Sequence, residues 1–175
     1  MYRKILTNDI YFKPFFDEIN KYSEGVHNLN KGISNGEIKG LEVALKIELP
    51  IKYTKLLELC NGGELFAVPT GTVLSEVYIP SNGEMKGGAS YLNESLKKER
   101  RWPNMPEKFL IIADTSYGDV ICMDLETNNG DESRIVKWNH EEGEITDSWE
   151  RLIDWLMEEL EIGEMLVNYD GTDKE

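Results

Sequence analysis

Carboxylates gather in the second half of the chain, where residues 114–132 hold six acids and residues 141–147 hold four more. The first group lies on the strands and turns of one predicted hairpin region, and the second follows the next predicted strand. If these strands pair, the carboxylates crowd along one rim of the sheet, and like charges destabilise a fold unless a basic partner or a metal offsets them. The alternative is a solvated acidic rim. We expect the partner-binding surface to be formed by Asp114, Asp119, Asp124, Glu126, Glu141 and Glu142.

The other reactive side chains do not form a catalytic set. The two histidines, His27 and His140, lie far apart, and neither has a second histidine at the spacing of a zinc site. His140 is a candidate general base, but the alternative is a turn histidine that bonds a backbone group or a carboxylate. Cys60 and Cys122 fall in apolar surroundings, which predicts buried, inert thiols and no disulfide. We therefore expect no catalytic residue.

Glycine and acidic motifs give no clear ligand site either. Neither Gly62-Gly63 nor Gly87-Gly88 is followed by the Gly-Lys-Ser/Thr of a phosphate loop. Residues 124–130 loosely resemble a calcium loop, but the glycine is one place late and the terminal bidentate Glu is missing. A hairpin with acidic flanks is the preferred interpretation, with a calcium site as the alternative. We expect no metal and no cofactor.

The overall charge narrows the class of partner. The 175 residues include 33 acids and 19 Lys+Arg, which gives a formal net charge of −14. Such a chain repels nucleic-acid backbones and anionic membranes, and it suits a basic protein partner, although acidic proteins are often merely soluble. The longest apolar run, residues 109–113, is far too short to span a membrane, and no signal peptide is recognisable. We expect a cytoplasmic protein; the sequence leaves its oligomeric state open.

The first half of the chain is predicted to be mainly helical. A first-turn proline, Pro14, starts a helix to about residue 24, and residues 25–33 are predicted to form a loop. Ser34 and Glu37 form a capping box for a second helix, with Ile38, Leu41 and Leu45 on one face. After Leu49-Pro50, an apolar stripe of Tyr53, Leu56, Leu57 and Cys60 predicts a third helix, ended by Asn61-Gly62-Gly63.

The second half is predicted to be mainly strands. Strands are expected at residues 65–68 and 72–79, a polar helix at 90–100, and almost continuously apolar strands at 109–113 and 120–125 that suit burial on both faces. A further strand contains Ile135, Val136 and Trp138. Ser148 is expected to cap a last helix with Trp149, Leu152, Ile153, Leu156 and Leu160 on its buried stripe, before a fraying acidic tail at 161–175. This order predicts an α+β single domain with a mostly antiparallel central β-sheet flanked by helices.

These motifs, taken in order, resemble the SUKH superfamily, the Smi–Knr type domain. The resemblance rests on residues 33–45 with their capping box, on Leu49-Pro50, Tyr53 and Asn61-Gly62-Gly63, on residues 109–114 and 118–125, and on Val136, Trp138, His140-Glu141 and Ser148-Trp149. It covers residues 33–160, after an N-terminal helix or arm at 1–32 and before the acidic tail at 161–175. Residues 66–105 match poorly.

The resemblance implies a bacterial immunity protein without enzyme activity. Such proteins bind and block a toxin domain, often a nuclease. The cell that makes the immunity protein keeps it in its own cytoplasm. A basic toxin domain agrees with the acidic charge, but the resemblance does not say which residues touch it. Two other hypotheses stay open: a regulatory interaction module with an endogenous partner, and a hydrolase that uses His140 with Glu141 or Asp124.

Overall fold

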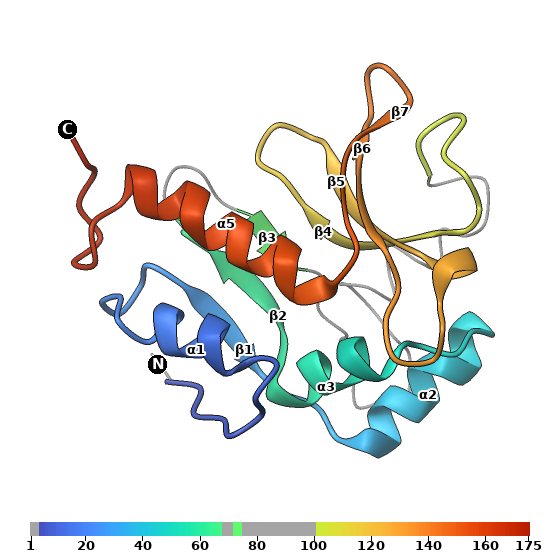
Figure 1. Ribbon diagram of the computed structural model, residues 1–175, viewed down its shortest axis with the longest axis horizontal. Helices are drawn as coiled ribbons and strands as arrows, with labels where there is room; N and C mark the ends of the chain where they lie inside the picture. Colours follow the sequence, from blue (N-terminus) through green and yellow to red (C-terminus); the bar gives the residue numbers. More distant parts are fainter. Residues whose placement is uncertain (1–3, 68–71, 75–100) are drawn as a thin grey trace, which may run out of the picture.

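Helices lie against one face of a twisted antiparallel sheet in the computed structural model, which describes residues 4–67, 72–74 and 101–175 (Figure 1). The chain is an α+β single domain, as predicted. Its elements are α1 (Lys13–Ile19), β1 (Asn28–Lys31), α2 (Asn35–Leu45), α3 (Ile51–Leu59), β2 (Cys60–Leu65), β3 (Thr72–Leu74), β4 (Phe109–Asp114), β5 (Val120–Asp124), the 3₁₀ turn η2 (Leu125–Thr127), β6 (Ile135–Asn139), β7 (Glu144–Trp149) and α5 (Leu152–Leu166).

The strands follow one another in the sheet in the order in which they follow in the chain. Within the described ranges the sheet runs β1-β2-β3-β4-β5-β6-β7, and every neighbouring pair is antiparallel. β1 and β7 are therefore its two edges. Register shifts interrupt the β1–β2, β4–β5 and β6–β7 pairs, and such bulges increase the twist of a sheet.

Both faces of β4 and β5 are buried, as their continuous apolar runs predict. Alternate residues of a strand point to opposite faces. On β4, Leu110 and Ile112 join the larger core beneath the helices, while Phe109 and Ile111 join a smaller core on the opposite face. That smaller core also contains Met105, Val120, Cys122, Val136 and Trp138.

The capping box predicted for α2 is confirmed. The backbone N–H of Glu37 donates to Ser34 Oγ at 3.3 Å, and Ser34 N–H donates to Glu37 Oε2 at 2.7 Å. α2 buries Ile38, Leu41 and Leu45, and α3 buries Tyr53, Leu56 and Leu57, so both predicted stripes face the core.

Three predictions for the first half are wrong. α1 ends at Ile19 and not near residue 24, because the chain tightens into i→i−3 bonds and Ser23 N–H then donates to Tyr169 O. Residues within the predicted loop at 25–33 form strand β1, whose polar side chains carry no strand pattern. Cys60 belongs to β2 and not to a helical stripe, so Gly62 and Gly63 lie inside a strand at positive φ, where Gly63 allows close approach to the backbone of Asn28.

The end of the chain also differs from the prediction. Ser148 does not cap α5, because residues 144–149 form β7 and the helix starts at Leu152 with Arg151 at its N-cap. The predicted stripe of α5 is otherwise buried. Residues 161–175 do not fray from position 161: α5 continues to Leu166, Val167 is buried, and Val167 pairs with Asp173.

Two predictions fall largely on residues that the structure does not describe. Of the predicted strand at 72–79, it describes Thr72–Leu74 as β3, and the predicted helix at 90–100 lies outside the described residues, as does most of the poorly matching segment 66–105. Across the described ranges, no helix has both the length and the apolar character to cross a membrane.

Candidate functional site

The six candidate acids do not share one rim, so that prediction is wrong. β4 and β5 are antiparallel, with Asp114 opposite Val120 and Phe109 opposite Asp124. Asp114 and the residues that precede Val120 are therefore at one end of the sheet, while Asp124 is at the other, roughly 13 Å away along the strand. The acids divide into one group with Asp114, Asp119, Glu141 and Glu142, and another with Asp124 and Glu126.

Asp124 is a structural residue. Its side chain is fully buried, and its Oδ2 atom lies 3.3 Å from Lys108 Nζ and 3.1 Å from Arg134 Nη2. Its Oδ1 atom accepts the backbone N–H of Glu126 at 3.2 Å, which starts the η2 turn. Glu126 is 72% exposed and adds a second ion pair to Lys108 at 3.0 Å. A partner cannot reach Asp124 without unpacking this turn.

Asp119 is also buried, and its carboxylate is bonded to another residue of the protein. It is 7% exposed, and its Oδ1 atom accepts the backbone N–H of His140 at 3.4 Å and lies 3.2 Å from His140 Nδ1. A Cβ at Gly118 would lie 2.8 Å from His140 Cε1, so the glycine, at φ +95°, lets the imidazole pack closely. The Trp102 ring also packs against the imidazole, with ring centroids 5.0 Å apart. His140 is thus a turn histidine bonded to a carboxylate, as the alternative interpretation held.

Glu141 and Glu142 remain available to a partner. Both are exposed in the β6–β7 turn, and their backbone N–H groups both donate to Asn139 Oδ1, at 2.9 and 2.8 Å. Glu144 and Asp147 extend the exposed acidic surface along β7. None of these four carboxylates has an ion pair with a described residue. We call them, with the turn and strand that carry them, the acidic hairpin.

Asp114 is more buried than the carboxylates of the acidic hairpin. It is the last residue of β4 and is only half-exposed. Burial raises the pKa of its carboxyl group above the ordinary value, because desolvation disfavours the charged form. It lies at the same end of the sheet as the acidic hairpin, but it is not a free surface charge.

The cysteines and His27 are core residues. Burial raises the pKa of the Cys60 thiol to about 12, and it also raises the pKa of Cys122, which confirms the prediction of buried, unreactive thiols. His27 is 4% exposed, and burial lowers its pKa to about 4. Its Nδ1 atom accepts the backbone N–H of Phe66 at 3.1 Å, which fixes a neutral ring.

The calcium-like loop has no free set of ligands. Asp124 is paired with two cations, and Asn128 Oδ1 accepts the backbone N–H of Gly130 at 2.8 Å. The Asn128 amide donates to Glu48 O at 2.9 Å. In the described part of the chain, no group of three His, Cys, Asp or Glu residues is placed to hold a metal ion.

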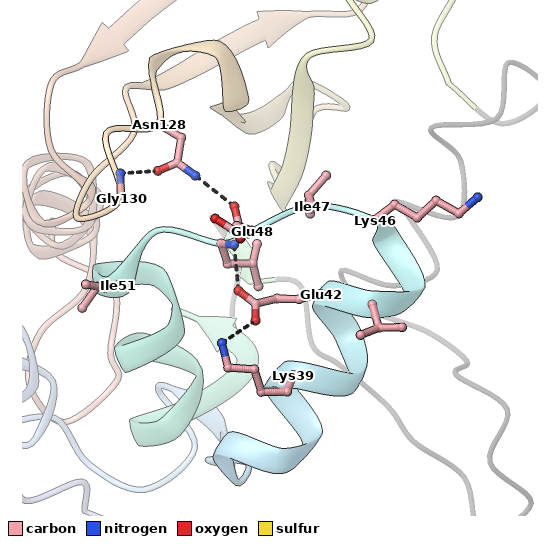
Figure 2. Close-up of a pocket in the computed structure, with 10 residues that line it drawn as sticks. Lys39, Glu42, Lys46, Ile47, Glu48, Ile51, Asn128 and Gly130 are labelled. Atoms are coloured by element: carbon pink, nitrogen blue, oxygen red, sulfur yellow. Dashed lines mark hydrogen bonds and ion pairs between the residues drawn. The ribbon is translucent and has the colours of Figure 1, made fainter.

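An open groove of about 720 Å³ lies between the end of α2, the α2–α3 linker and the turn before β6 (Figure 2). Its polar groups join these segments. Glu42 Oε1 accepts Leu49 N–H at 2.9 Å while Glu42 Oε2 lies 3.0 Å from Lys39 Nζ, and the carbonyl of Gly130 accepts Ile51 N–H at 3.0 Å. These bonds hold the end of α2, the linker and the turn before β6 together around the groove.

The groove was not predicted from the sequence, although one signal for it was present. Val43 and Ile51 lie off the apolar stripes of α2 and α3, and they are 78% and 61% exposed. Large apolar side chains at such positions favour contact with another protein. Figure 2 shows Ile47 and Lys46 along the same linker.

The comparisons with known proteins agree with this fold. The model of the SMI1 / KNR4 family (SUKH-1) matches residues 32–158. These residues include the sheet from β2 to β7, both helices that border the groove, and the acidic hairpin. No curated protein matches the chain.

Proposed function

This chain belongs to the SMI1 / KNR4 family (SUKH-1), and we propose that it is an immunity protein that binds and neutralises a cognate toxin domain. The domain is a basic one, and a nuclease is the form that we favour. The protein acts in the cytoplasm of the bacterium that makes both proteins.

The acidic hairpin is the observation that carries the proposal. It displays four exposed carboxylates without a described cation to neutralise them, on a chain with a net charge of −14. The active-site face of a nuclease is basic because it binds phosphates. An acidic surface is attracted to that face before contact and fits it after contact, which raises the rate and specificity of association.

In this proposal the protein neutralises the toxin by binding to it, without catalysing a reaction. His140 is bonded to Asp119 and is in contact with Gly118 and Trp102, and Asp124 lies at the opposite end of the sheet. The hydrolase hypothesis paired His140 with Glu141 or Asp124, and the geometry does not favour it. The protein would block the toxin by covering its basic surface.

Rescue from toxicity tests the proposal. Candidate toxins are the C-terminal domains of large polypeptides encoded beside this chain; each would be co-expressed with it, and survival would be scored together with co-purification of the two proteins. Survival with a stable complex is the expected result. Death without a complex would show that this chain does not neutralise the toxin domain tested. Recovery of a non-toxic binding partner from the native cytoplasm would favour a regulatory interaction module instead.

A further inference from the structure

Among the described residues, β7 forms an unpaired edge of the sheet. β7 pairs with β6 along one side, and no described residue pairs with its other side. Glu144 to Ser148 are exposed, and Trp149 is half-buried. A six-residue strand of this kind presents roughly 20 Å of backbone N–H and C=O groups that another extended segment can bond.

The opposite edge is less accessible. Strand β1 has four residues, and its Leu29 packs against the main core. Residues 4–6 and 29–31 line the same small cavity of about 200 Å³, so the N-terminal segment lies beside this edge. β7 is consequently the edge better placed to accept a partner.

β7 is rigidly held before any partner binds. The turn before it is fixed by three hydrogen bonds to Asn139. The backbone N–H groups of Glu141 and Glu142 donate to Asn139 Oδ1, and Gly143 N–H donates to Asn139 O at 2.9 Å. At its far end, Trp149 Nε1 donates to Glu158 Oε2 of α5 at 2.7 Å. A strand already fixed at both ends loses little conformational entropy on binding, which favours affinity.

The side chains of β7 determine which strands it accepts. Lys137 is opposite Asp147 and Trp138 is opposite Ile145, so Thr146 is the extra residue of a bulge. Charges and bulges on an edge strand prevent indiscriminate pairing. A second copy of β7 would bring Glu144 and Asp147 against like charges, whereas a basic segment would neutralise them, and Ile145, 42% exposed, offers an apolar contact.

We propose that β7 binds an extended, lysine- or arginine-rich segment of the toxin domain as an added strand of the sheet. The inference rests on the proposed function and specifies how that complex forms. Main-chain hydrogen bonds along β7 supply the affinity, and the carboxylates of the acidic hairpin select basic side chains.

Hydrogen–deuterium exchange tests the added strand directly. The probe is the co-purified toxin domain used in the rescue experiment, and exchange is compared between the free protein and the complex. The amides of residues 144–149 are expected to exchange at least about tenfold more slowly in the complex, since new backbone bonds protect them. β1 is the matched internal control, and its exchange should be unchanged. A complex that leaves the exchange of residues 144–149 unchanged would overturn the inference and leave the immunity function standing.

Two substitutions at Thr146 separate backbone pairing from side-chain contact. Thr146→Pro places a proline on the edge strand, where it hinders pairing with an added strand, and proline is tolerated at bulges; we expect the Kd to rise about 100-fold or more. Thr146→Ala keeps the N–H and should bind within about threefold of wild type. Circular dichroism would check that both variants fold, and equal affinity of two folded variants would count against strand addition. If Thr146→Pro does not fold, the exchange measurement decides. A wild-type protein that neither rescues nor binds would instead overturn the proposed function.

Discussion

Phe66 packs directly onto Gly163, so that a Cβ built on the glycine would lie 2.0 Å from Phe66 Cε2. The contact joins the residue that follows β2 to the last turn of α5. Phe66 has φ +49°, and it is held there by bonds from its own N–H to His27 and from Ala67 N–H to Val26 O. The Phe66 ring also packs edge-on against Tyr22 and His27, so it has little room to move away from a larger residue at position 163.

Gly163→Ala should therefore destabilise the protein, although alanine favours helices. We expect a loss of about 2–3 kcal/mol in the free energy of unfolding, the usual effect of overpacking a core. Gly40→Ala in α2 is the matched control: nothing lies within 4 Å of its Cβ, and it should stabilise by up to about 1 kcal/mol. Urea unfolding of the two variants would measure both values, and a neutral or stabilising Gly163→Ala would contradict the packing.

Asp124 and Glu126 should differ in their importance for stability, although both pair with Lys108. Asp124→Asn removes a buried charge from two cations and should cost about 2–3 kcal/mol, below the maximum for a buried pair because Lys108 and Arg134 keep contact with water. Glu126→Gln changes an exposed pair and should cost less than about 0.5 kcal/mol. Equal losses in chemical unfolding would show that burial does not decide the effect.

His27 should make the fold sensitive to mild acid. Its pKa is about 4 in the folded protein against an ordinary value of 6.5, so between these values the unfolded chain binds more protons and acid favours unfolding. The contribution of neutral His27 to the free energy of unfolding is therefore fully present above about pH 6.5. It decreases as the pH falls toward 4, by about 2 kcal/mol between pH 7 and pH 5.

The measurement for His27 is a comparison with His27→Gln, which cannot titrate. Unfolding free energies at pH 7 and pH 5 would be determined for both proteins. The carboxyl groups of Asp114 and Glu132, whose pKa values burial raises, act in the opposite direction, but they are common to both proteins and cancel in the comparison. The same pH dependence in both would exclude His27 as the cause.

Charge reversal in the acidic hairpin should slow association with the toxin domain. Glu141→Lys with Glu142→Lys is expected to lower the association rate about tenfold at low salt and to have little effect at about 0.5 M salt, where the charges are screened. Glu161→Lys with Glu164→Lys makes the same change in net charge on the exposed surface of α5. Stopped-flow kinetics would measure the association rate of each double variant. Equal slowing by both would indicate that net charge alone determines the rate.

His140→Ala should leave neutralisation of the toxin intact. The ring supports the β6–β7 turn through Asp119, so its loss is expected to lower stability by about 1–2 kcal/mol without loss of rescue. The rescue assay and thermal unfolding would be run on the same variant. A stable, folded His140→Ala protein that fails to rescue would contradict this prediction and would indicate that His140 takes part in neutralisation chemically.

Elements with strong local signals were predictable from the sequence. The capping box at Ser34 and the doubly buried strands β4 and β5 are confirmed, because short-range hydrogen bonds and continuous apolar runs determine them. β1 and β7 were missed for a common reason. They are edge strands with exposed polar side chains, so neighbouring backbone, and not their own sequence, makes them strands.

The candidate site was only partly predictable. The structure leaves Glu141 and Glu142 exposed, and their role in binding stays a prediction; the sequence could not show that Asp124 lies at the opposite end of β5 or that Asp119 is bonded to His140. Both facts depend on strand direction and register. The groove at Val43 and Ile51 depends on three segments that meet only in the folded chain.

The chain order of the sheet has a consequence for synthesis on the ribosome. Each new strand from β2 onward can be added beside the strand made just before it, so the sheet grows in one direction as the polypeptide emerges. No strand within the described ranges has to be inserted between two that already pair, which limits the time during which unpaired edges invite aggregation. Growth stops at β7 because the chain then turns into α5, and a strand supplied by another protein would be the next one in the same series.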